Sequence, residues 1–366
     1  MSDEDSTRRL LTLVITTSPT LSAPSTELIS TLLNSIKAHC ALLFKCNVIV
    51  VFDGWDKVAA QPRLKKGHVT QRLADDYVVY KDNVKALFLE QYLQSTLDDT
   101  KLMKSTGEAE YGSASSNIIT PAVYTTSSTE CGQVTFIEAV DQRLGFGLAV
   151  RTALRTVQTP YTWVHQHDWA LVHDIPIVSL LAVMRDTESD PSRPVKYICL
   201  PSGRRPTYAV SDRVMRYSEL RKLAAALTGD FPVAQDTSAM VPLTPMFFWH
   251  DKPHIASTSH YMGRIFPNRL AMMRGAFIED TIGHRARDQM KAGAWTKWAT
   301  WQYNPDGGRQ PCLKHLHGRT WRGGDEEEKV KEARRSRNSA AVQDAPAIAI
   351  DLLSCQGMDL EYPHRY

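Results

Sequence analysis

Residues 11–15 (LTLVI) and residues 47–52 (NVIVVF) are two short apolar runs, each ended by polar or turn-forming residues. Between them, apolar residues from Leu28 to Ile36 recur at the spacing of one helix face. A strand, a helix and a strand in this order predict a βαβ unit, because two parallel strands need a crossover connection. The chain is therefore expected to contain a parallel sheet covered by helices.

Polar residues follow both strands at the point where each strand ends. Thr16 and Thr17 come after the first strand, and Asp53 and Asp56 come after the second. Ligands of open α/β sheets bind at the carboxyl ends of the strands, so these four residues are expected on the functional edge. The alternative for Asp53 and the glycine after it is an ordinary turn pair.

The composition is that of a globular protein. The chain has 366 residues, of which 43% are hydrophobic and 23% charged, enough for one large domain or two ordinary ones. The formal net charge of +3 is close to neutral for this size. We therefore expect no nucleic-acid partner and no anionic membrane surface as a partner.

The six cysteines form no Cys-x-x-Cys pair, which is typical of reduced, buried thiols in an intracellular protein. Residues 10–15 are too few and too rich in threonine for the core of a signal peptide. No stretch approaches the roughly 20 apolar residues of a membrane span. These features predict a cytoplasmic protein without a transmembrane segment.

The composition changes along the chain and suggests three parts. We expect a flexible N-terminus over residues 1–9, one globular domain over residues 10–322, and a charged helical tail, partly disordered, over residues 323–366. Residues 95–132 are rich in Ser, Thr and Gly with little periodicity, which predicts a long surface insertion. Alternating charge over residues 325–337 predicts a solvated helix.

A later strand, Tyr161–Val164, which follows a third strand over Val134–Val140, leads directly into His165, Gln166, His167 and Asp168. A carboxylate at a strand end can hold a hard divalent cation, with diphosphate oxygens completing its shell. The alternative role for the aspartate is a helix cap or a loop. The two histidines are two positions apart, so in an extended segment both project from one face and the glutamine from the other.

Two further motifs lie downstream. Residues 277–280 (FIED) carry adjacent carboxylates, and residues 315–317 (HLH) carry two histidines. A carboxylate beside a hydroxyl is what general-base catalysis requires, and a helix cap is the alternative. A surface loop is the alternative for the histidines. Between these motifs, Trp295, Trp298 and Trp301 are expected to pack in the core rather than to stack on a sugar.

In their order, residues 12–19, 48–54, 145–168 and 275–280 resemble the GT-A fold nucleotide-sugar glycosyltransferases, in particular the inverting, glycosyltransferase family 2-like group. The resemblance extends over roughly residues 10–322. It implies an α/β, Rossmann-like single domain with a mixed, mainly parallel central sheet flanked by helices.

The match to the family's central motif can be followed residue by residue. The family commonly has Ala-Arg-Asn, a helix, Gly-Glu-Tyr-Ile, an apolar strand and then Asp-x-Asp. Here residues 149–151 read Ala-Val-Arg, and residues 166–168 read Gln-His-Asp. Gln166 therefore stands where the family usually has its first carboxylate. Glutamine can hydrogen-bond ribose but adds no charge.

The resemblance implies a donor-binding role for Thr16, Thr17, Asp53, Arg151 and Gln166. The donor would be a nucleotide-diphosphate sugar such as a UDP-, GDP- or dTDP-sugar.

The resemblance also implies metal binding and catalysis. Asp168 would hold Mn²⁺ or Mg²⁺ together with His315 or His317, between which the sequence does not choose. Arg319 would bind the diphosphate, because guanidinium suits phosphate oxygens. Asp280 would be the catalytic base, oriented by Glu279, in a hexosyltransferase acting on a glycan, protein or small-molecule acceptor.

Two other functions remain open at this point. A metal-dependent hydrolase would use the cluster of His165, His167 and Asp168. A non-catalytic binding protein on the same fold is suggested by Gln166. The oligomeric state cannot be read from the sequence.

Overall fold

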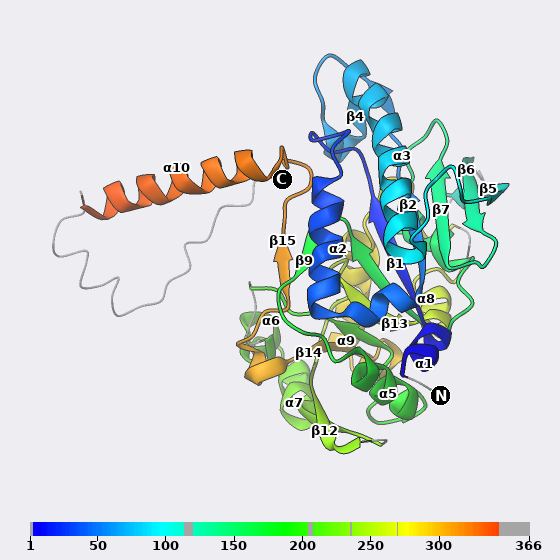
Figure 1. The fold of residues 1–366 in the computed structure, drawn as a ribbon. Helices are drawn as coiled ribbons and strands as arrows, with labels where there is room; N and C mark the ends of the chain where they lie inside the picture. The colour runs from blue at the N-terminus through cyan, green and yellow to red at the C-terminus, as the bar shows by residue number, and fades with distance from the viewer. Residues whose placement is uncertain (1–2, 113–119, 204–207, 235, 269, 344–366) are drawn as a thin grey trace. The chain divides into compact units, whose positions relative to one another are not determined.

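The computed structural model describes residues 3–112, 120–203, 208–234, 236–268 and 270–343 (Figure 1). The chain divides into two compact units, Met1–Trp321 and Arg322–Tyr366, which are described one after the other.

Four parallel strands form the centre of an 11-stranded sheet in the first unit. In spatial order they are β8 (Tyr161–Gln166), β1 (Leu11–Thr17), β2 (Asn47–Phe52) and β7 (Val134–Ala139). All of β1 is buried, and β2 and β8 are buried except at one terminal residue each. Strands covered by helices on both faces need apolar residues at every position, which explains the continuous apolar runs. The predicted βαβ unit is confirmed.

Strands on both sides of this centre make the sheet mixed. Beyond β8 lie β13 (His254–Ser257), β10 (Tyr197–Cys199), β14 (Thr300–Tyr303), β12 (Asp236–Pro245) and β11 (Gly229–Val233). Of these pairs only β10 and β14 are parallel. Beyond β7 lie β6 (Thr120–Thr129) and β5 (Leu102–Tyr111), both in antiparallel pairing. The predicted α/β fold class, a mixed sheet with a parallel centre, is confirmed.

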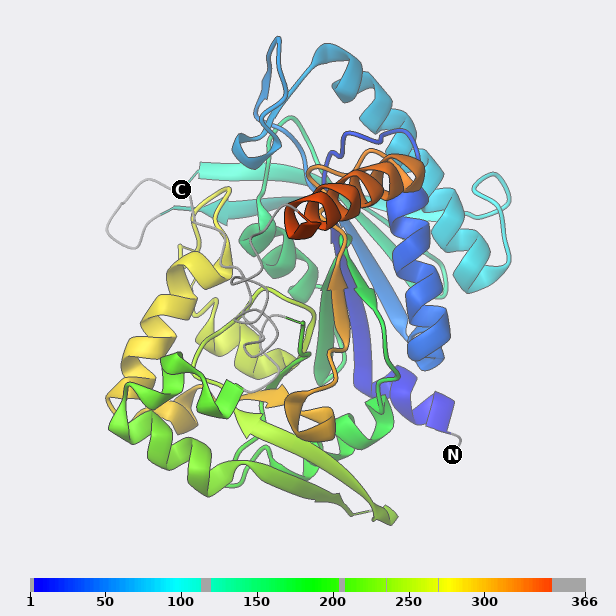
Figure 2. The same cartoon turned by 90° about the vertical axis from the view of Figure 1, so that its left-hand side faces the viewer.

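Helices cover both faces of the parallel centre. α2 (Glu27–His39) and α3 (Gln71–Leu93) lie on one face, and α4 (Phe146–Leu154), which connects β7 to β8, lies on the other (Figures 1 and 2). Right-handed crossovers require this arrangement, because β1 to β2 and β7 to β8 step in opposite directions across the sheet. The other α-helices of this unit are α1 (Asp3–Leu10), α5 (Ile177–Thr187), α6 (Asp212–Met215), α7 (Ser218–Leu227), α8 (Thr258–Arg264) and α9 (His284–Lys291).

Two small sheets accompany the large one. β9 (Trp169–Leu171) pairs antiparallel with β15 (Leu313–His315), and β3 (Lys57–Val58) pairs with β4 (His68–Val69). The first of these brings a late part of the chain to the end of β8.

Two segments contain regular structure that the sequence pattern did not indicate. Most of residues 95–132, predicted as a long surface insertion, form the hairpin of β5 and β6. Threonine and β-branched residues fit a pleated surface, and Ala109 and Ala122 are fully buried there. Residues 3–10 form α1. Acidic residues begin this helix and basic residues end it, which complements the helix dipole.

The core contains the three tryptophans, as predicted: Trp295, Trp298 and Trp301 are all buried. Among the described residues, Cys40, Cys46, Cys131, Cys199 and Cys312 are free thiols, and only Cys131 is exposed. In the described part of the chain, no helix has both the length and the apolar character needed to cross a membrane.

The second unit contains α10 (Gly324–Gln343), which confirms the predicted charged helix. Its first turn carries Asp325, Glu326 and Glu327, and a lysine at 329 bonds Glu326 one turn later. Residues 344–366 lie outside the described part of the chain.

A glycine pair determines how the chain turns from β7 into α4. Gly145 has a φ of +79°, and a Cβ placed there would collide with the backbone of Gly275, lying 2.7 Å from its nitrogen. Gly132 has a similar φ of +67° but open space around its Cβ position. Gly132→Ala therefore isolates the cost of the left-handed backbone, about 1 kcal/mol. Gly145→Ala adds a backbone clash.

We expect Gly145→Ala to lower the free energy of unfolding by at least about 2 kcal/mol more than Gly132→Ala, because backbone cannot move aside as a side chain can. Urea denaturation of both variants measures the difference. Equal losses would show that Gly275 does not constrain the turn.

Candidate active site

The strand ends predicted to carry function share one edge of the sheet. Thr16 in β1 is in register with Gln166 in β8, and the Thr16 carbonyl accepts the His167 N–H at 3.0 Å. The Asp53 N–H donates to the Thr17 carbonyl at 2.8 Å. The parallel register thus brings all of these residues to the carboxyl edge.

Asp168 occupies the turn between β8 and β9, where the late segment of the chain meets it. His315 Nε2 donates to Asp168 Oδ2 at 3.1 Å, and the Gly318 N–H donates to the same oxygen at 3.2 Å. The Leu316 N–H donates to the Asp168 carbonyl at 2.7 Å. The pairing of β9 with β15 sets Trp169 opposite His315 and so determines this approach. Of the two late histidines, the structure places His315 against Asp168.

The Asp168 carboxylate is held ionised with one oxygen unused. Burial alone would raise the pKa of Asp168, but the His315 hydrogen bond and the nearby His167 lower it to about 2. The other oxygen, Oδ1, is buried and has no hydrogen-bond partner among the described residues. A Cβ at Gly318 would lie 2.8 Å from Asp168 Cβ and 2.9 Å from His167 Nε2, so this close approach needs glycine.

The residues around Asp168 fit a divalent cation as a partial ligand set. Within the described ranges, no three His, Cys, Asp or Glu side chains are grouped as a complete metal site. The buried Oδ1 of Asp168 is a carboxylate oxygen with no partner among the described residues. His315 Nε2 would have to lose the proton that it donates to Asp168 Oδ2 before it could bind an ion. Diphosphate oxygens and water would have to supply the remaining ligands.

His167 belongs to a buried polar chain behind Asp168. Its Nδ1 lies 2.7 Å from Thr17 Oγ1, which in turn lies 2.9 Å from the Tyr80 hydroxyl. Burial lowers the pKa of His167, although the charge of Asp168 acts in the opposite direction. The Thr17 hydroxyl therefore supports His167 rather than facing open solvent.

His165 points into the core and is not part of this cluster. Trp163 Nε1 donates to His165 Nδ1 at 3.1 Å, so Nε2 carries the proton and donates to the Trp169 carbonyl at 2.9 Å. Both ring nitrogens are engaged, and burial lowers the pKa of His165 to about 4. No nitrogen is left to bind a metal ion.

Glu279 and Asp280 begin a short π-helix, Glu279–Gly283. The Asp251 carboxyl accepts the Glu279 N–H at 3.3 Å, and the Asp251 N–H and His250 Nδ1 each lie 3.4 Å from Glu279 Oε2. Gln166 Nε2 donates to the Asp251 carbonyl at 2.7 Å. Gln166 at the strand end is thus linked through Asp251 to the acidic pair, while Asp280 itself is exposed.

Arg319 lies between the two acidic motifs. Its guanidinium stands 5.3 Å from the ring centre of Phe277, three residues before Asp280. Partial burial lowers the pKa of Arg319, while the charges of Asp168 and Asp280 raise it. The segment after β15 therefore contacts both sides of the site, Asp168 through the Gly318 N–H and Phe277 through the Arg319 guanidinium.

Two of the predicted donor-binding residues have internal partners. The Asp53 carboxylate accepts the N–H groups of Gly54, Leu144 and Gly145 at 2.6–3.0 Å. Burial raises its pKa to about 6 despite these bonds. Arg151 is buried in α4 and donates to the Glu110 carbonyl in β5. Neither side chain joins the Asp168 cluster.

Two residues that the sequence did not single out also shape the site. Asp251 lies in residues 250–254, which look like a polar loop, yet its side chain is buried. Arg143 is 3.7 Å from Asp53 Oδ2 and its charge reaches Arg319. The residue types of Asp251 and Arg143 do not by themselves indicate a role in the site. Only the position of Arg143, two residues before Gly145 at the turn into α4, points to one.

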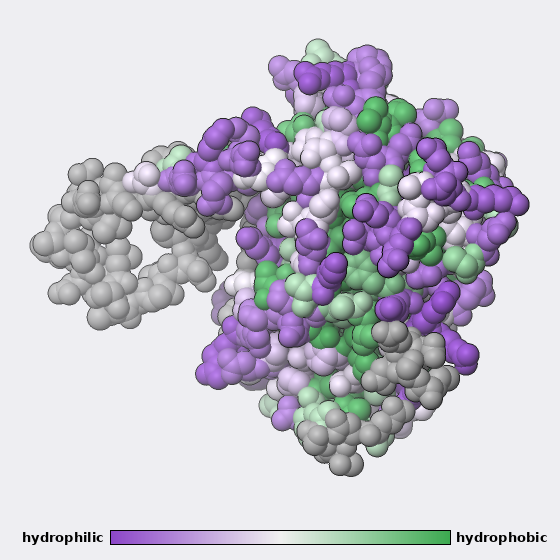
Figure 3. Space-filling model, viewed as in Figure 1, coloured by the Kyte–Doolittle hydropathy of each residue, from purple (hydrophilic) through white to green (hydrophobic). Residues whose placement is uncertain are grey.

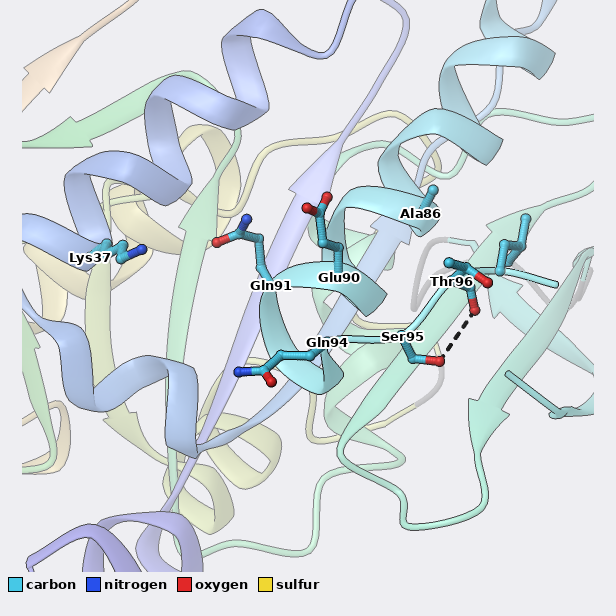
Figure 4. Close-up of a pocket in the computed structure, with 8 residues that line it drawn as sticks. Lys37, Ala86, Glu90, Gln91, Gln94, Ser95 and Thr96 are labelled. Carbon is cyan, nitrogen blue, oxygen red and sulfur yellow. Dashed lines mark hydrogen bonds between the residues drawn. The ribbon is translucent and has the colours of Figure 1, made fainter. Parts of the chain in front are cut away.

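A surface pocket of about 610 Å³ lies elsewhere, between α2 and the end of α3. In Figure 4, Lys37 comes from α2 and faces Glu90 and Gln91 of α3 and Gln94, which follows that helix. The end of α2 leads through a short 3-10 helix, Ala41–Lys45, into the start of β2, so this pocket lies toward the amino ends of the parallel strands. It contains none of the predicted site residues.

No protein-family model and no curated protein matches this chain. Solved structures similar to it include the mannosyltransferase PcManGT from Pyrobaculum calidifontis in complex with GDP-Man and Mn²⁺. The identity is 15%, the match covers 93% of this chain and 66% of that chain, and the TM-score is 0.38.

Another similar structure is S. aureus TarS 1-349 in complex with UDP, with 10% identity, coverage of 83% of this chain and 59% of that chain, and a TM-score of 0.37. The complex of TarS 1-349 with UDP-GlcNAc matches at 11% identity over 69% of this chain and 46% of that chain, with a TM-score of 0.32. This chain spans about two thirds or less of the length of these proteins. One of them is a glycosyltransferase, the class that the sequence resembles, but likeness at this level identifies no function.

The buried histidines predict a pH dependence of stability. Burial lowers the pKa of His165 to about 4, of His254 to about 3 and of His260 to about 4, from an ordinary 6.5. Between pH 6.5 and about 4 the unfolded chain binds these protons and the folded chain does not. Stability should therefore fall as pH decreases through this window, by up to about 1.4 kcal/mol per pH unit for each histidine.

Urea denaturation at several pH values between 6.5 and 4.5 measures this slope. His165→Gln and His254→Gln should each reduce the slope by about one proton relative to the unmodified protein. An unchanged slope in His165→Gln would show that His165 is not held neutral.

Proposed function

We propose that this protein is an inverting glycosyltransferase that moves a hexose from a nucleotide-diphosphate donor to an acceptor hydroxyl with the help of a divalent metal ion. The observation that carries the proposal is the position of the segment after β15: the Gly318 N–H donates to Asp168, and the Arg319 guanidinium lies over Phe277, three residues before Asp280. This segment thus links a carboxylate that is hydrogen-bonded to a histidine, a guanidinium and the acidic pair that contains Asp280. These are the groups that such a transfer needs.

Asp168 and His315 are proposed to hold Mn²⁺ or Mg²⁺ on the donor side. The Oδ1 of Asp168, which has no partner among the described residues, supports this assignment, and His315 Nε2 would give up its proton to bind the ion. When bound, the ion would neutralise charge on the leaving diphosphate. His317 remains a second candidate ligand, since its ring lies 4.4 Å from that of His315.

Asp280 is proposed to act as the general base. Glu279 is engaged by Asp251 and His250, whereas Asp280 is exposed beside Arg319. Asp280 would take the proton of the acceptor hydroxyl as its oxygen bonds to the anomeric carbon. The bond from that carbon to the diphosphate breaks on the opposite side, which inverts the configuration.

Arg319 is proposed to bind the diphosphate, because a guanidinium pairs well with phosphate oxygens. Among the predicted donor contacts, Thr16 and Gln166 lie at the strand edge and are proposed to contact the donor directly. The side chains of Thr17, Asp53 and Arg151 bond within the protein and would mainly stabilise this edge. The nucleotide could be that of a UDP-, GDP- or dTDP-sugar, and the acceptor a glycan, protein or small molecule.

The two other functions are not equally supported. A hydrolase using His165, His167 and Asp168 would lack His165 as a metal ligand, because both nitrogens of His165 are hydrogen-bonded in the core. A non-catalytic binding protein remains the second candidate, since Gln166 is occupied by the Asp251 carbonyl and brings no charge. Donor binding without turnover would identify it.

Substitution of the two aspartates separates donor binding from chemistry. Asp168→Asn should abolish Mn²⁺-dependent stabilisation by a nucleotide-sugar, because the ionised ligand is lost. Asp280→Asn should keep that stabilisation and lower turnover by roughly 10²–10⁴-fold, the usual contribution of a general base. A thermal-shift screen of nucleotide-sugars, with and without Mn²⁺, and a donor-turnover assay measure the two effects.

Asp174→Asn is the matched control, since this exposed aspartate follows β9 and pairs with His39, away from the Asp168 cluster. It should leave both readouts unchanged. Full turnover by Asp280→Asn would exclude the proposed base. Stabilisation with no turnover in the unmodified protein would favour the binding protein.

Asp251 provides a second, independent test. Burial and the neighbouring Glu279 raise the pKa of Asp251 well above its ordinary value, so its carboxyl is expected to be neutral. Asp251→Asn keeps an acceptor for the Glu279 N–H and should retain turnover within about threefold. Asp251→Ala removes both oxygens and should lower turnover by roughly tenfold or more. Steady-state kinetics, with melting temperatures checked, compare them; equal losses in both would contradict a neutral positioning role.

A further inference from the structure

The strand β5 ends the large sheet beyond β7 and β6. In the described part of the chain it pairs with β6 and with no other strand. Residues 103–106 and 108 are exposed, and the surface over β5 and β6 is mainly hydrophilic (Figure 3). A ten-residue edge strand of this kind is a template for pairing with another strand.

The register shows which peptide groups of β5 point to the open edge. The Val123 carbonyl accepts the Val140 N–H at 2.9 Å, so the Val123 peptide faces β7. Its neighbour Tyr124 therefore faces β5, where it is opposite Gly107. Because peptide directions alternate along a strand, odd-numbered residues of β5 face β6 and even-numbered residues face outward.

A contact at one end of β5 supports this assignment and limits the open stretch. Arg151 of α4 donates to the Glu110 carbonyl, which must point away from β6 to be reached. The edge is therefore closed at Glu110. The outward-facing residues before it are Leu102, Lys104, Thr106 and Glu108, and Thr106 lies midway between the two charged ones.

This open stretch is complementary to itself in one orientation. If two copies of β5 pair antiparallel about Thr106, Lys104 of each copy lies opposite Glu108 of the other. Even-numbered side chains share one face, so the two opposite-charge pairs form on the same side of the joined sheet. A parallel arrangement in register would instead set like charges opposite each other, which is unfavourable.

We propose that β5 is a self-association surface and that its partner is β5 of a second copy of this chain, paired antiparallel about Thr106. The two large sheets then continue into one another across a two-fold axis. An isologous contact of this kind is the commonest form of homodimer. The contact is short and polar, so the dissociation constant should be on the order of micromolar to 100 micromolar.

Charge exchange tests the register. In the Lys104→Glu variant, both cross-strand pairs of the dimer consist of two glutamates. In the Glu108→Lys variant, both pairs consist of two lysines. Each single variant should weaken dimerisation at least about tenfold, and the double variant Lys104→Glu/Glu108→Lys should restore it. Sedimentation equilibrium up to about 500 micromolar measures the constants, and added salt should reduce the differences.

A proline substitution tests the backbone pairing. Thr106→Pro removes an outward-facing N–H and should abolish the dimer, while the ladder between β5 and β6 keeps its own bonds. Lys101→Glu is the matched control, because Lys101 pairs with Glu130 on the hairpin itself and lies outside the proposed contact. It should leave dimerisation unchanged. Circular dichroism confirms that each variant is folded.

Hydrogen exchange gives a direct reading of the contact. The amides of Lys104, Thr106 and Glu108 should exchange more slowly at high protein concentration than at low concentration, whereas that of Ser105 should not change. A monomer at about 500 micromolar, or a dimer that the exchange of the two charges does not affect, would overturn the proposal. Both results are independent of whether the protein transfers a sugar.

Discussion

The antiparallel contact of β9 with β15, closed by the hydrogen bond from His315 to Asp168, is the constraint on which the candidate site depends. It returns the chain to the end of β8 after about 145 residues and brings Gly318 and Arg319 with it. A buried carboxylate is costly unless it is paired. The late segment supplies that pairing at one Asp168 oxygen, while the other has no partner in the described part of the chain. The contact of β9 with β15 therefore joins two distant parts of the chain and leaves one carboxylate oxygen of Asp168 available to a ligand at the strand edge.

Three aspartates at this end of the sheet have three different environments. Asp168 is buried against histidines and a backbone N–H, which lower its pKa to about 2. Asp251 is buried beside Glu279, which raises its pKa. Asp280 is exposed near Arg319. Carboxylates whose surroundings differ in this way can divide roles. These surroundings favour Asp168 as an ionised ligand, Asp251 as a neutral positioning group and Asp280 as a free base.

Much of the architecture could be predicted because it depends on local patterns. The continuous apolar runs of β1 and β2 and the spacing of α2 are properties of single segments, and the structure confirms them. The hairpin of β5 and β6 was not predicted because its Ser and Thr residues resemble those of a loop. These residues form strands because β6 pairs with β7, a contact that the local sequence does not indicate. The burial of Asp251 and the inward direction of His165 depend on contacts distant in sequence. No local pattern contains that information.

The donor edge and the free edge of the sheet are joined by α4. Asp53 holds the turn that starts this helix through the Leu144 and Gly145 N–H groups, and Arg151, farther along it, closes the edge at Glu110. Helix α4 is therefore held at both ends. Energetic coupling between two distant sites requires a structural element that can adopt two arrangements. Gly145 lies so close to Gly275 that a Cβ added there would collide with the backbone, so the two segments are closely packed at this turn. Pairing at β5 should therefore add stability to the hairpin without altering the chemistry at the carboxyl ends of the strands.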